Sequence, residues 1–196
     1  AAQVGSLTHF YRAMSSGQFD LRGEAMPRRY ESLHPAAAYL STEPGKPGSF
    51  GQFVRELLEQ ADAEVDFTRY DNDGPDGAPN SGDDDGVVDY LFVMVSSMPR
   101  GFIIGGATGI ATLGLTTPFI SADRGIRGQP IQIRSGSDRG SIGQEGTFSQ
   151  TVGTMAHEFA HGLGLPDLYD LDSGDPGEDS AGVGAWCLMG WGAHGW

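Results

Sequence analysis

The sequence predicts a single domain of the α+β class, and three observations carry this prediction. Residues 50–65 and 148–163 each repeat apolar side chains every three or four positions, which is the pattern of a helix with one buried face. Residues 87–95, VVDYLFVMV, form a β-branched apolar run of the length of one strand. The chain has 196 residues, which suffices for one hydrophobic core. We therefore expect residues 1–196 to fold as one unit.

The first half of the chain begins with a short predicted helix over residues 6–14, with Ser6 as its N-cap. Its apolar positions are Leu7, Phe10, Tyr11 and Met14. Residues 17–34 are expected to form strand and loop, and the helix of residues 50–65 follows. Residues 71–86 show no apolar periodicity and therefore predict a loop.

The second half of the chain is expected to supply most of the sheet. Residues 87–95 are apolar enough to predict a buried central strand. A glycine-rich segment, residues 101–114, leads to two short outer strands over residues 116–120 and 131–134. The helix of residues 148–163 is the second long one, and the residues after it predict an irregular C-terminal part.

The charge balance excludes two classes of partner. The chain carries 12 lysine and arginine residues against 26 acidic ones, for a formal charge of −14. Such a chain repels phosphate backbones and anionic lipid surfaces, so we expect neither nucleic acid nor a membrane as a partner. The single cysteine, Cys187, excludes an internal disulfide and a cysteine-based zinc site, and we expect it to be a small buried residue.

Residues 157–161, His-Glu-Phe-Ala-His, carry the chemistry of the chain. On a helix, positions four apart share a face, so the imidazoles of His157 and His161 can reach one metal ion. Glu158 stands beside them as the base that a zinc-bound water requires, because its proton must be taken up and later delivered to the leaving amine. We therefore predict His157 and His161 as zinc ligands and Glu158 as the catalytic base.

The motif continues with Gly164 and Asp167, in the pattern of the long zincin motif with aspartate as its third ligand. Gly164 can adopt the left-handed conformation that ends the helix, and Pro166 prevents the helix from resuming. The chain can then return Asp167 to the metal. The rival third ligand is His194, whereas His9 and His34 are expected to be ordinary histidines.

Residues 184–190, GAWCLMG, place Met189 in an apolar turn about two dozen residues after the zinc motif. A Met-turn in this position would give the imidazoles a hydrophobic floor without competing as a ligand. The alternative is a methionine of the ordinary core. Both interpretations predict that Met189 is buried.

The strings HEFAHGLGLPDLYD and GAWCLMG closely resemble the immune inhibitor A family of secreted bacterial zinc peptidases, a metzincin-like group. The resemblance extends to SLTHFYRAMSSGQF and VDFTRYDNDGPDGAPNSGDDDGVVDYLFVMV. It implies a twisted mixed sheet packed on two long helices, with an active-site helix and a Met-turn below the metal. It also implies a secreted zinc endopeptidase with protein or peptide substrates.

Two departures from the family pattern concern the ends of the chain. No strand is predicted ahead of residues 6–14, and the chain stops seven residues after Met189. We expect residues 1–196 to be a single metallopeptidase catalytic domain, and truncation at one or both ends stays open.

Two short acidic loops predict calcium. They alternate carboxylates around glycine, as loops that wrap oxygens round a calcium ion do. The candidate calcium ligands are Asp71, Asp73, Asp76, Asp83, Asp85 and Asp89. The alternative is a solvated acidic turn. A weaker candidate cluster follows the zinc motif and comprises Asp170, Asp172, Asp175, Glu178 and Asp179.

A second function remains open beside the endopeptidase. The acidic loops also suit a calcium-dependent binding or adhesion module that has kept a structural zinc. Four protein ligands would close a structural site, whereas three ligands leave a position for water and substrate.

Overall fold

The computed structural model describes residues 3–26, 28–104, 107–171 and 180–194. In chain order the helices and strands are α1 (Leu7–Met14), α2 (Phe50–Ala61), β1 (Leu91–Val95), β2 (Gly109–Ile110), β3 (Phe119–Arg124), β4 (Pro130–Ile133), β5 (Gly140–Gln144) and α3 (Phe148–Gly162). Short 3-10 helices are η1 (Ala36–Tyr39), η2 (Phe67–Tyr70), η3 (Gly184–Trp186) and η4 (Trp191–His194). Helices and strands thus form the expected mixed α+β fold.

The strands form two small sheets. In the three-stranded sheet the order is β1-β5-β2, with β1 parallel and β2 antiparallel to β5. Strands β3 and β4 form a separate antiparallel pair. The three-stranded sheet is therefore mixed, as expected. The strands form two small sheets, however, and not one continuous twisted sheet.

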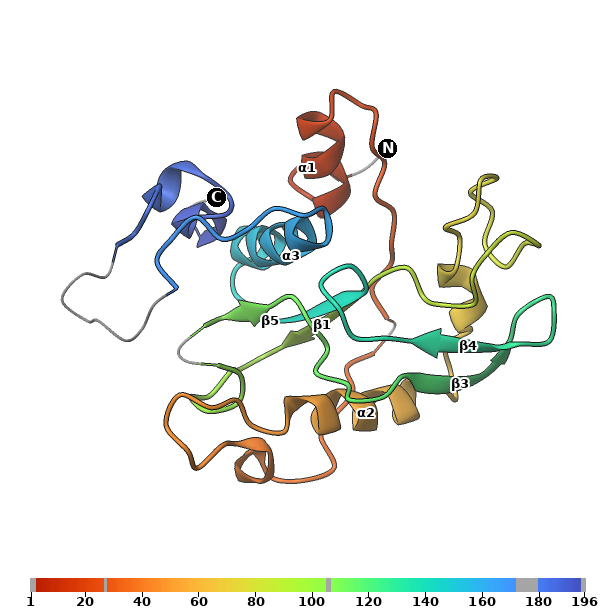
Figure 1. Ribbon diagram of the computed structural model, residues 1–196, viewed down its shortest axis with the longest axis horizontal. Coiled ribbons are helices and arrows are strands. Elements are labelled where there is room, and N and C mark those ends of the chain that lie inside the picture. Colours follow the sequence, from red (N-terminus) through yellow and green to blue (C-terminus); the bar gives the residue numbers. More distant parts are fainter. Residues whose placement is uncertain (1–2, 27, 105–106, 172–179, 195–196) are drawn as a thin grey trace.

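The helices cover the two sides of the three-stranded sheet, with α3 and α1 on one side and α2 on the other (Figure 1). The larger core lies between α2 and the strands and includes Val54, Leu58 and Ile142. A smaller core joins α1 to α3 through Tyr11 and Phe159. None of the helices in the described ranges has the length and apolar content needed to cross a bilayer.

Local signals in the sequence set the helix ends. The Ser6 hydroxyl accepts the backbone N–H of His9 and caps α1 as predicted. A capping box of Thr147 and Gln150 begins α3, which is the helix predicted over residues 148–163. Helix α2 ends at Ala61, four residues before the predicted end at Val65.

The prediction of one buried central strand over residues 87–95 is wrong in two respects. The segment is divided: Val87 bridges to Gln132 beside β4, and only Leu91–Val95 pairs with β5. Between the two parts the N–H of Asp89 donates to the carbonyl of Tyr70 instead of a neighbouring strand. The central strand of the sheet is β5, and β1 lies at its edge.

Strand β5 has the sequence GSIGQ, in which only Ile142 carries an apolar signal. Small residues are needed there because the neighbours approach closely. A Cβ atom at Gly140 would lie 2.7 Å from the carbonyl oxygen of Leu91, and one at Gly143 would lie 2.9 Å from Cγ2 of Thr154. The strand predicted within residues 17–34 is not found in the described residues 17–26 and 28–34.

Candidate metal centre

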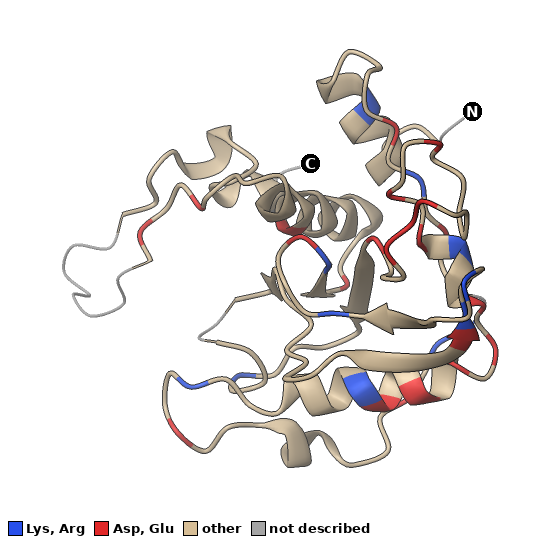
Figure 2. Ribbon diagram, turned by 45° about the vertical axis from the view of Figure 1, so that its right-hand side comes forward, with Lys and Arg blue, Asp and Glu red and all other residues tan. Residues whose placement is uncertain are grey.

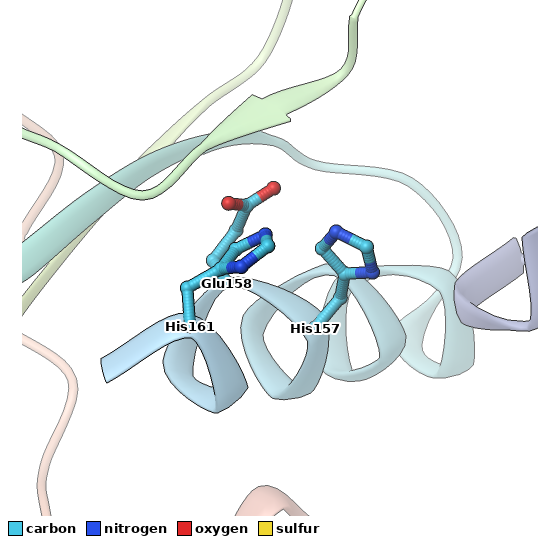
Figure 3. A group of neighbouring side chains, drawn as sticks. All are labelled: His157, Glu158 and His161. Atoms are coloured by element: carbon cyan, nitrogen blue, oxygen red, sulfur yellow. The ribbon is translucent and has the colours of Figure 1, made fainter. Parts of the chain in front are cut away.

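Helix α3 carries the three residues of the predicted zinc motif on one side (Figure 3). His157 and Glu158 are buried, with exposed fractions of 7% and 6%, and His161 is partly buried. One ligand atom from each residue lies within 4.8 Å of the others. The helical spacing therefore brings the two imidazoles and the carboxylate together as predicted.

Backbone carbonyls orient both imidazole rings. Nδ1 of His157 lies 2.8 Å from the carbonyl oxygen of Leu188, and Nδ1 of His161 lies 2.8 Å from that of Leu165. Because a carbonyl can only accept, each Nδ1 carries the proton and each Nε2 keeps its lone pair. Both Nε2 atoms are thereby prepared to bind a metal ion.

Gly164 ends α3 as the sequence predicted. Its φ is +87°, in the left-handed region that favours glycine. The N–H of Gly164 donates to the carbonyl of His161 and that of Leu165 to the carbonyl of Ala160, which together form a Schellman motif. The same turn places the Leu165 carbonyl against the His161 ring.

Asp167 returns to the two imidazoles after this turn. Its Oδ1 lies 3.0 Å from Nε2 of His157 and 3.5 Å from Nε2 of His161. The same oxygen is buried and has no hydrogen-bond partner within the described residues. A buried carboxylate oxygen without a partner is costly unless a cation occupies the space in front of it.

These donors fit a zinc ion. Ligand atoms in a tetrahedral zinc site lie about 2.0–2.1 Å from the metal and hence roughly 3.3 Å from one another. The distances of 3.0 and 3.5 Å from Asp167 to the two nitrogens bracket this value. Two imidazole nitrogens and one carboxylate oxygen also leave a fourth position open.

Glu158 lies under strand β2. Burial, reinforced by the negative charge of Asp167, raises the pKa of Glu158 to about 8. A dication between the neighbouring ligands would oppose this shift, because it favours the ionised carboxylate. The environment of Glu158 therefore suits a group that takes up a proton and gives it back near neutral pH.

A cavity of about 330 Å³ opens beside Glu158. Its lining comes from the segment of β2, from α3 and from the C-terminal part: Ala107, Thr108, Gly109, Thr154, His157, Glu158, Tyr169, Gly190, Trp191 and Ala193. No pattern in the sequence pointed to Gly109, Tyr169 or Trp191 as lining residues. Tyr169 follows the end of the motif by two residues, and only this proximity to Asp167 could have suggested that Tyr169 lines the site.

The turn that contains Met189 contacts the motif through the carbonyl of Leu188, which lies against the His157 ring. Met189 is 3% exposed, as both interpretations predicted. The expectation that Cys187 is buried is wrong, because its side chain is partly exposed. Its carbonyl closes the turn by accepting the N–H groups of Gly190 and Gly192, and Leu188 packs against the smaller core instead. The side chain of His194 lies outside the described part of the chain.

The acidic loops lie apart from the zinc motif. Figure 2 shows many acidic residues on the side of the molecule that carries the 71–86 loop, away from the C-terminal segment. Ligand oxygens of Asp71, Asp73 and Asp89 lie within 4.8 Å of one another. Asp71 is 1% exposed, and its Oδ1 has no hydrogen-bond partner within the described residues.

The other three calcium candidates take part in turns. Oδ1 of Asp76 accepts the N–H of Ala78, and Oδ2 of Asp83 accepts the N–H of Asp76. Oδ1 of Asp85 accepts the N–H of Val87. The structure thus gathers three of the six predicted carboxylates. Of the weaker cluster, residues 172–179 lie outside the described residues, and only Asp170 is described.

Gly109 allows strand β2 to approach Glu158. A Cβ atom at this position would lie 2.3 Å from Oε1 of Glu158 and 3.1 Å from Cγ2 of Thr154. The end of a flexible side chain can give way, so Gly109→Ala should displace the Glu158 carboxylate and leave the fold intact. If Glu158 is the base that the sequence predicts, activity should fall about 10- to 100-fold, because a misplaced catalytic group loses rate steeply. Peptide hydrolysis and thermal melting of the variant measure the two effects.

The matched control is Gly23→Ala, since a Cβ atom at Gly23 would meet no atom within 4 Å. This variant should keep both full activity and the same melting temperature. Full activity of Gly109→Ala would contradict the proposed crowding of Glu158.

The α+β fold and a helix that presents two imidazoles, a buried carboxylate and a third donor after a glycine turn define a metallopeptidase. The family described as "Immune inhibitor A peptidase M6, catalytic domain" matches residues 1–196. The chain belongs to this family.

Two named relatives are similar at modest identity. The Pre-pro-metalloprotease PrtV of Vibrio cholerae is 27% identical over 199 residues, which cover 94% of this chain and 21% of the relative. Immune inhibitor A of Bacillus thuringiensis subsp. alesti is 26% identical over 207 residues, which cover 96% of this chain and 28% of the relative. The chain therefore spans between a fifth and a third of the length of these relatives.

Proposed function

We propose that this domain is a zinc-dependent endopeptidase that belongs to a secreted protein. The observation that supports this function best is the convergence of three donors beside a buried base. Oδ1 of Asp167, which has no hydrogen bond within the described residues, faces Nε2 of His157 and Nε2 of His161 at 3.0 and 3.5 Å. Together these three residues would hold the ion.

Bound zinc would supply positive charge that polarises the scissile carbonyl and acidifies the attacking water. The rest of the chemistry falls to the chain. Glu158 accepts the proton of the attacking water on a carboxylate oxygen and delivers it to the nitrogen of the leaving amine. The carbonyls of Leu188 and Leu165 keep the imidazoles in the tautomer that binds metal. Met189 forms part of the apolar floor under the site.

Strand β2 offers a place for an extended substrate. It lies at one edge of the sheet and, within the described residues, pairs only with β5. A peptide that adds to such an edge forms main-chain hydrogen bonds and places alternate side chains toward the protein. Because Gly109 of β2 also lines the cavity beside Glu158, the scissile bond would lie next to the base.

Removal of zinc tests this proposal. A strong chelator should abolish hydrolysis of a casein-like substrate, and stoichiometric zinc should restore it. The reason is that the bound zinc is the proposed source of the Lewis acidity that the reaction needs. Metal content and turnover are measured on the same sample. Full turnover of the metal-free protein would refute the proposed mechanism.

A calcium site formed by Asp71, Asp73 and Asp89 is part of the proposal. Burial, reinforced by repulsion from Asp84, raises the pKa of Asp71 to about 6. Burial, with repulsion from Asp73 and Asp71, raises that of Asp89 to about 6. A divalent cation would neutralise this repulsion and occupy the space before Oδ1 of Asp71. We expect the ion to stabilise the loop that leads into β1.

The stability of the zinc-loaded protein should therefore depend on pH and calcium together. Without calcium, the folded state holds protons on Asp71 and Asp89 more tightly than the unfolded chain, because both pKa values are raised to about 6. Their contribution to stability consequently falls as pH rises from about 4 to 7. Calcium binds the ionised carboxylates, so it should raise the melting temperature most at pH 7 and above.

The control is a pair of variants. Asp71→Asn should lose the calcium-dependent shift in melting temperature, whereas Asp76→Asn keeps its hydrogen-bond acceptor for Ala78 and should retain the shift. An identical melting temperature with and without calcium at pH 7.5 would favour the solvated acidic turn.

The acidic cluster also favours the second candidate, a calcium-dependent binding module with a structural zinc. A structural site would be closed by four protein ligands. The described donors around the zinc position are two imidazoles, Asp167 and the base Glu158, and they adjoin a cavity. This arrangement supports the endopeptidase over the binding module.

A further inference from the structure

Two tyrosine hydroxyls donate to the backbone of α3, the helix that carries the zinc motif. Helix α1 lies against α3, and its Tyr11 hydroxyl donates to the carbonyl of Ala156 at 2.6 Å (Figure 1). The hydroxyl of Tyr90, which directly precedes β1, donates to the carbonyl of Glu158 at 3.3 Å. The two accepting residues are the neighbours of His157 on either side. Two separate segments thus hold α3 at the point where the motif begins.

These bonds add to the helix and do not compete with it. A carbonyl oxygen has two lone pairs, so it can accept a phenol as well as the N–H four residues further on. Burial raises the pKa of Tyr11 far above the usual range of a phenol and that of Tyr90 to about 12. Both phenols are therefore protonated and donate over the whole range from about pH 5 to 9.

The rings of both tyrosines meet at Phe159, which lies inside the zinc motif. They contact the Phe159 ring edge to face, with centroids 5.1 Å away for Tyr11 and 4.9 Å away for Tyr90. Phe159 is two residues from both His157 and His161, and positions two apart on a helix point to nearly opposite sides. The aromatic contacts therefore hold the side of α3 that faces away from the two imidazoles.

The rotation and height of α3 decide where the zinc donors lie. Apolar packing around Phe159 has no preferred direction, whereas a hydrogen bond restricts both distance and angle. The opposite side of the helix leaves little tolerance: a Cβ atom at Gly109 would lie 2.3 Å from Oε1 of Glu158. Nε2 of His157 lies 3.0 Å from Oδ1 of Asp167. A small rotation of α3 would change both arrangements together.

We propose that Tyr11 and Tyr90 are positioning residues of the metallopeptidase site, whose hydroxyls fix the backbone of α3 on either side of His157. The proposal rests on the roles proposed above for His157 as a zinc ligand and Glu158 as the base. Neither tyrosine is among the described residues that line the cavity beside Glu158. Both therefore act through the backbone of α3 and not on the substrate.

The test is the double variant Tyr11→Phe, Tyr90→Phe, which keeps both rings and removes both hydroxyls. We expect the turnover number at zinc saturation to fall about 10-fold, because a misplaced catalytic group loses rate steeply. KM should stay unchanged, since no contact with substrate is removed. Both constants are measured on casein-like peptides well below the melting temperature of each protein.

The affinity for zinc is the second measurement, made by competition with a soluble chelator. We expect the double variant to bind zinc about 10-fold more weakly, as when a group that orients a ligand is removed. An unchanged turnover number or an unchanged zinc affinity overturns the proposal. A rise in KM also overturns it, in favour of direct contact with substrate.

The matched control is Tyr39→Phe, which removes a buried hydroxyl that donates to the carboxylate of Glu56 in α2. Helix α2 covers the other side of the three-stranded sheet (Figure 1). This variant should lower the melting temperature but keep the turnover number, KM and zinc affinity of the unmodified protein. Equal losses of turnover in the control and in the double variant would make the effect one of general stability and overturn the proposal.

The single variants keep the proposal testable if the double variant does not fold. Tyr11→Phe and Tyr90→Phe should each lower the turnover number and the zinc affinity about threefold, so that the two effects multiply to the loss expected of the pair. Unchanged values in both single variants would overturn the proposal.

These measurements also separate the positioning role from the proposed function. If the unmodified protein shows zinc-dependent turnover while the tyrosine variants behave normally, only the role of the two hydroxyls is wrong. If the unmodified protein hydrolyses peptides without zinc, the proposed function itself is wrong. If Glu158→Gln retains turnover, the assignment of the base fails, and zinc affinity still tests the hold on His157.

Discussion

Glu158→Gln is expected to retain zinc and to lose nearly all peptidase activity. The amide has the size of the carboxylate but can neither accept the proton of the attacking water nor return it to the leaving amine. General acid–base catalysis contributes roughly 10²- to 10⁴-fold, so we expect a loss of turnover in that range. The measurements are turnover of a casein-like substrate and metal content of the purified variant.

The matched control for this variant is Glu59→Gln on the exposed side of α2, which should change neither quantity. Substantial turnover by Glu158→Gln would exclude Glu158 as the base. A loss of zinc from this variant would instead make Glu158 a residue that maintains the metal site.

Asp167→Ala is expected to weaken zinc binding by more than about 100-fold, because loss of a ligand should exceed the 10- to 100-fold cost of losing an outer hydrogen bond. The substitution removes the carboxylate oxygen that faces both imidazoles at 3.0 and 3.5 Å. It leaves His157 and His161 as the remaining protein donors of the three. A zinc titration of the variant measures the effect.

His194→Ala distinguishes the two candidates for the third ligand, and we expect it to bind zinc as the unmodified protein does. Normal zinc binding by Asp167→Ala together with weak binding by His194→Ala would reverse the assignment. An anionic third ligand also leaves less positive charge at the metal than a third imidazole, which makes the base Glu158 more necessary.

Local spacing made most of the candidate metal centre predictable. The four-residue interval between His157 and His161 places both on one face of any helix, whatever surrounds it. The left-handed turn at Gly164, with φ +87°, was predictable because glycine readily adopts this conformation. The turn brings Asp167 back to the end of α3. These contacts join residues close in sequence, so a pattern in the chain can express them.

The strands were harder to predict because their signals depend on neighbours. Residues 87–95 have the pattern of one strand, yet the N–H of Asp89 donates to the carbonyl of Tyr70. The residues before Asp89 therefore pair with β4, and those after it pair with β5. Strand β5 lies at the centre of the sheet with a single apolar side chain, Ile142, because β1 and α3 leave space only for small residues.

The sequence by itself determined the α+β class, the helix that carries the metal motif, the turn that ends it and the chemical types of the candidate ligands. Only the tertiary structure decided which three of the six candidate calcium ligands lie together and how close Gly109 comes to Glu158. It also decided that the Leu188 carbonyl and the Tyr169 ring lie against His157. The physical reason is that helical periodicity and glycine turns act over a few residues. Contacts between β2 and α3, or between α3 and the turn at Met189, exist only after distant segments have packed together.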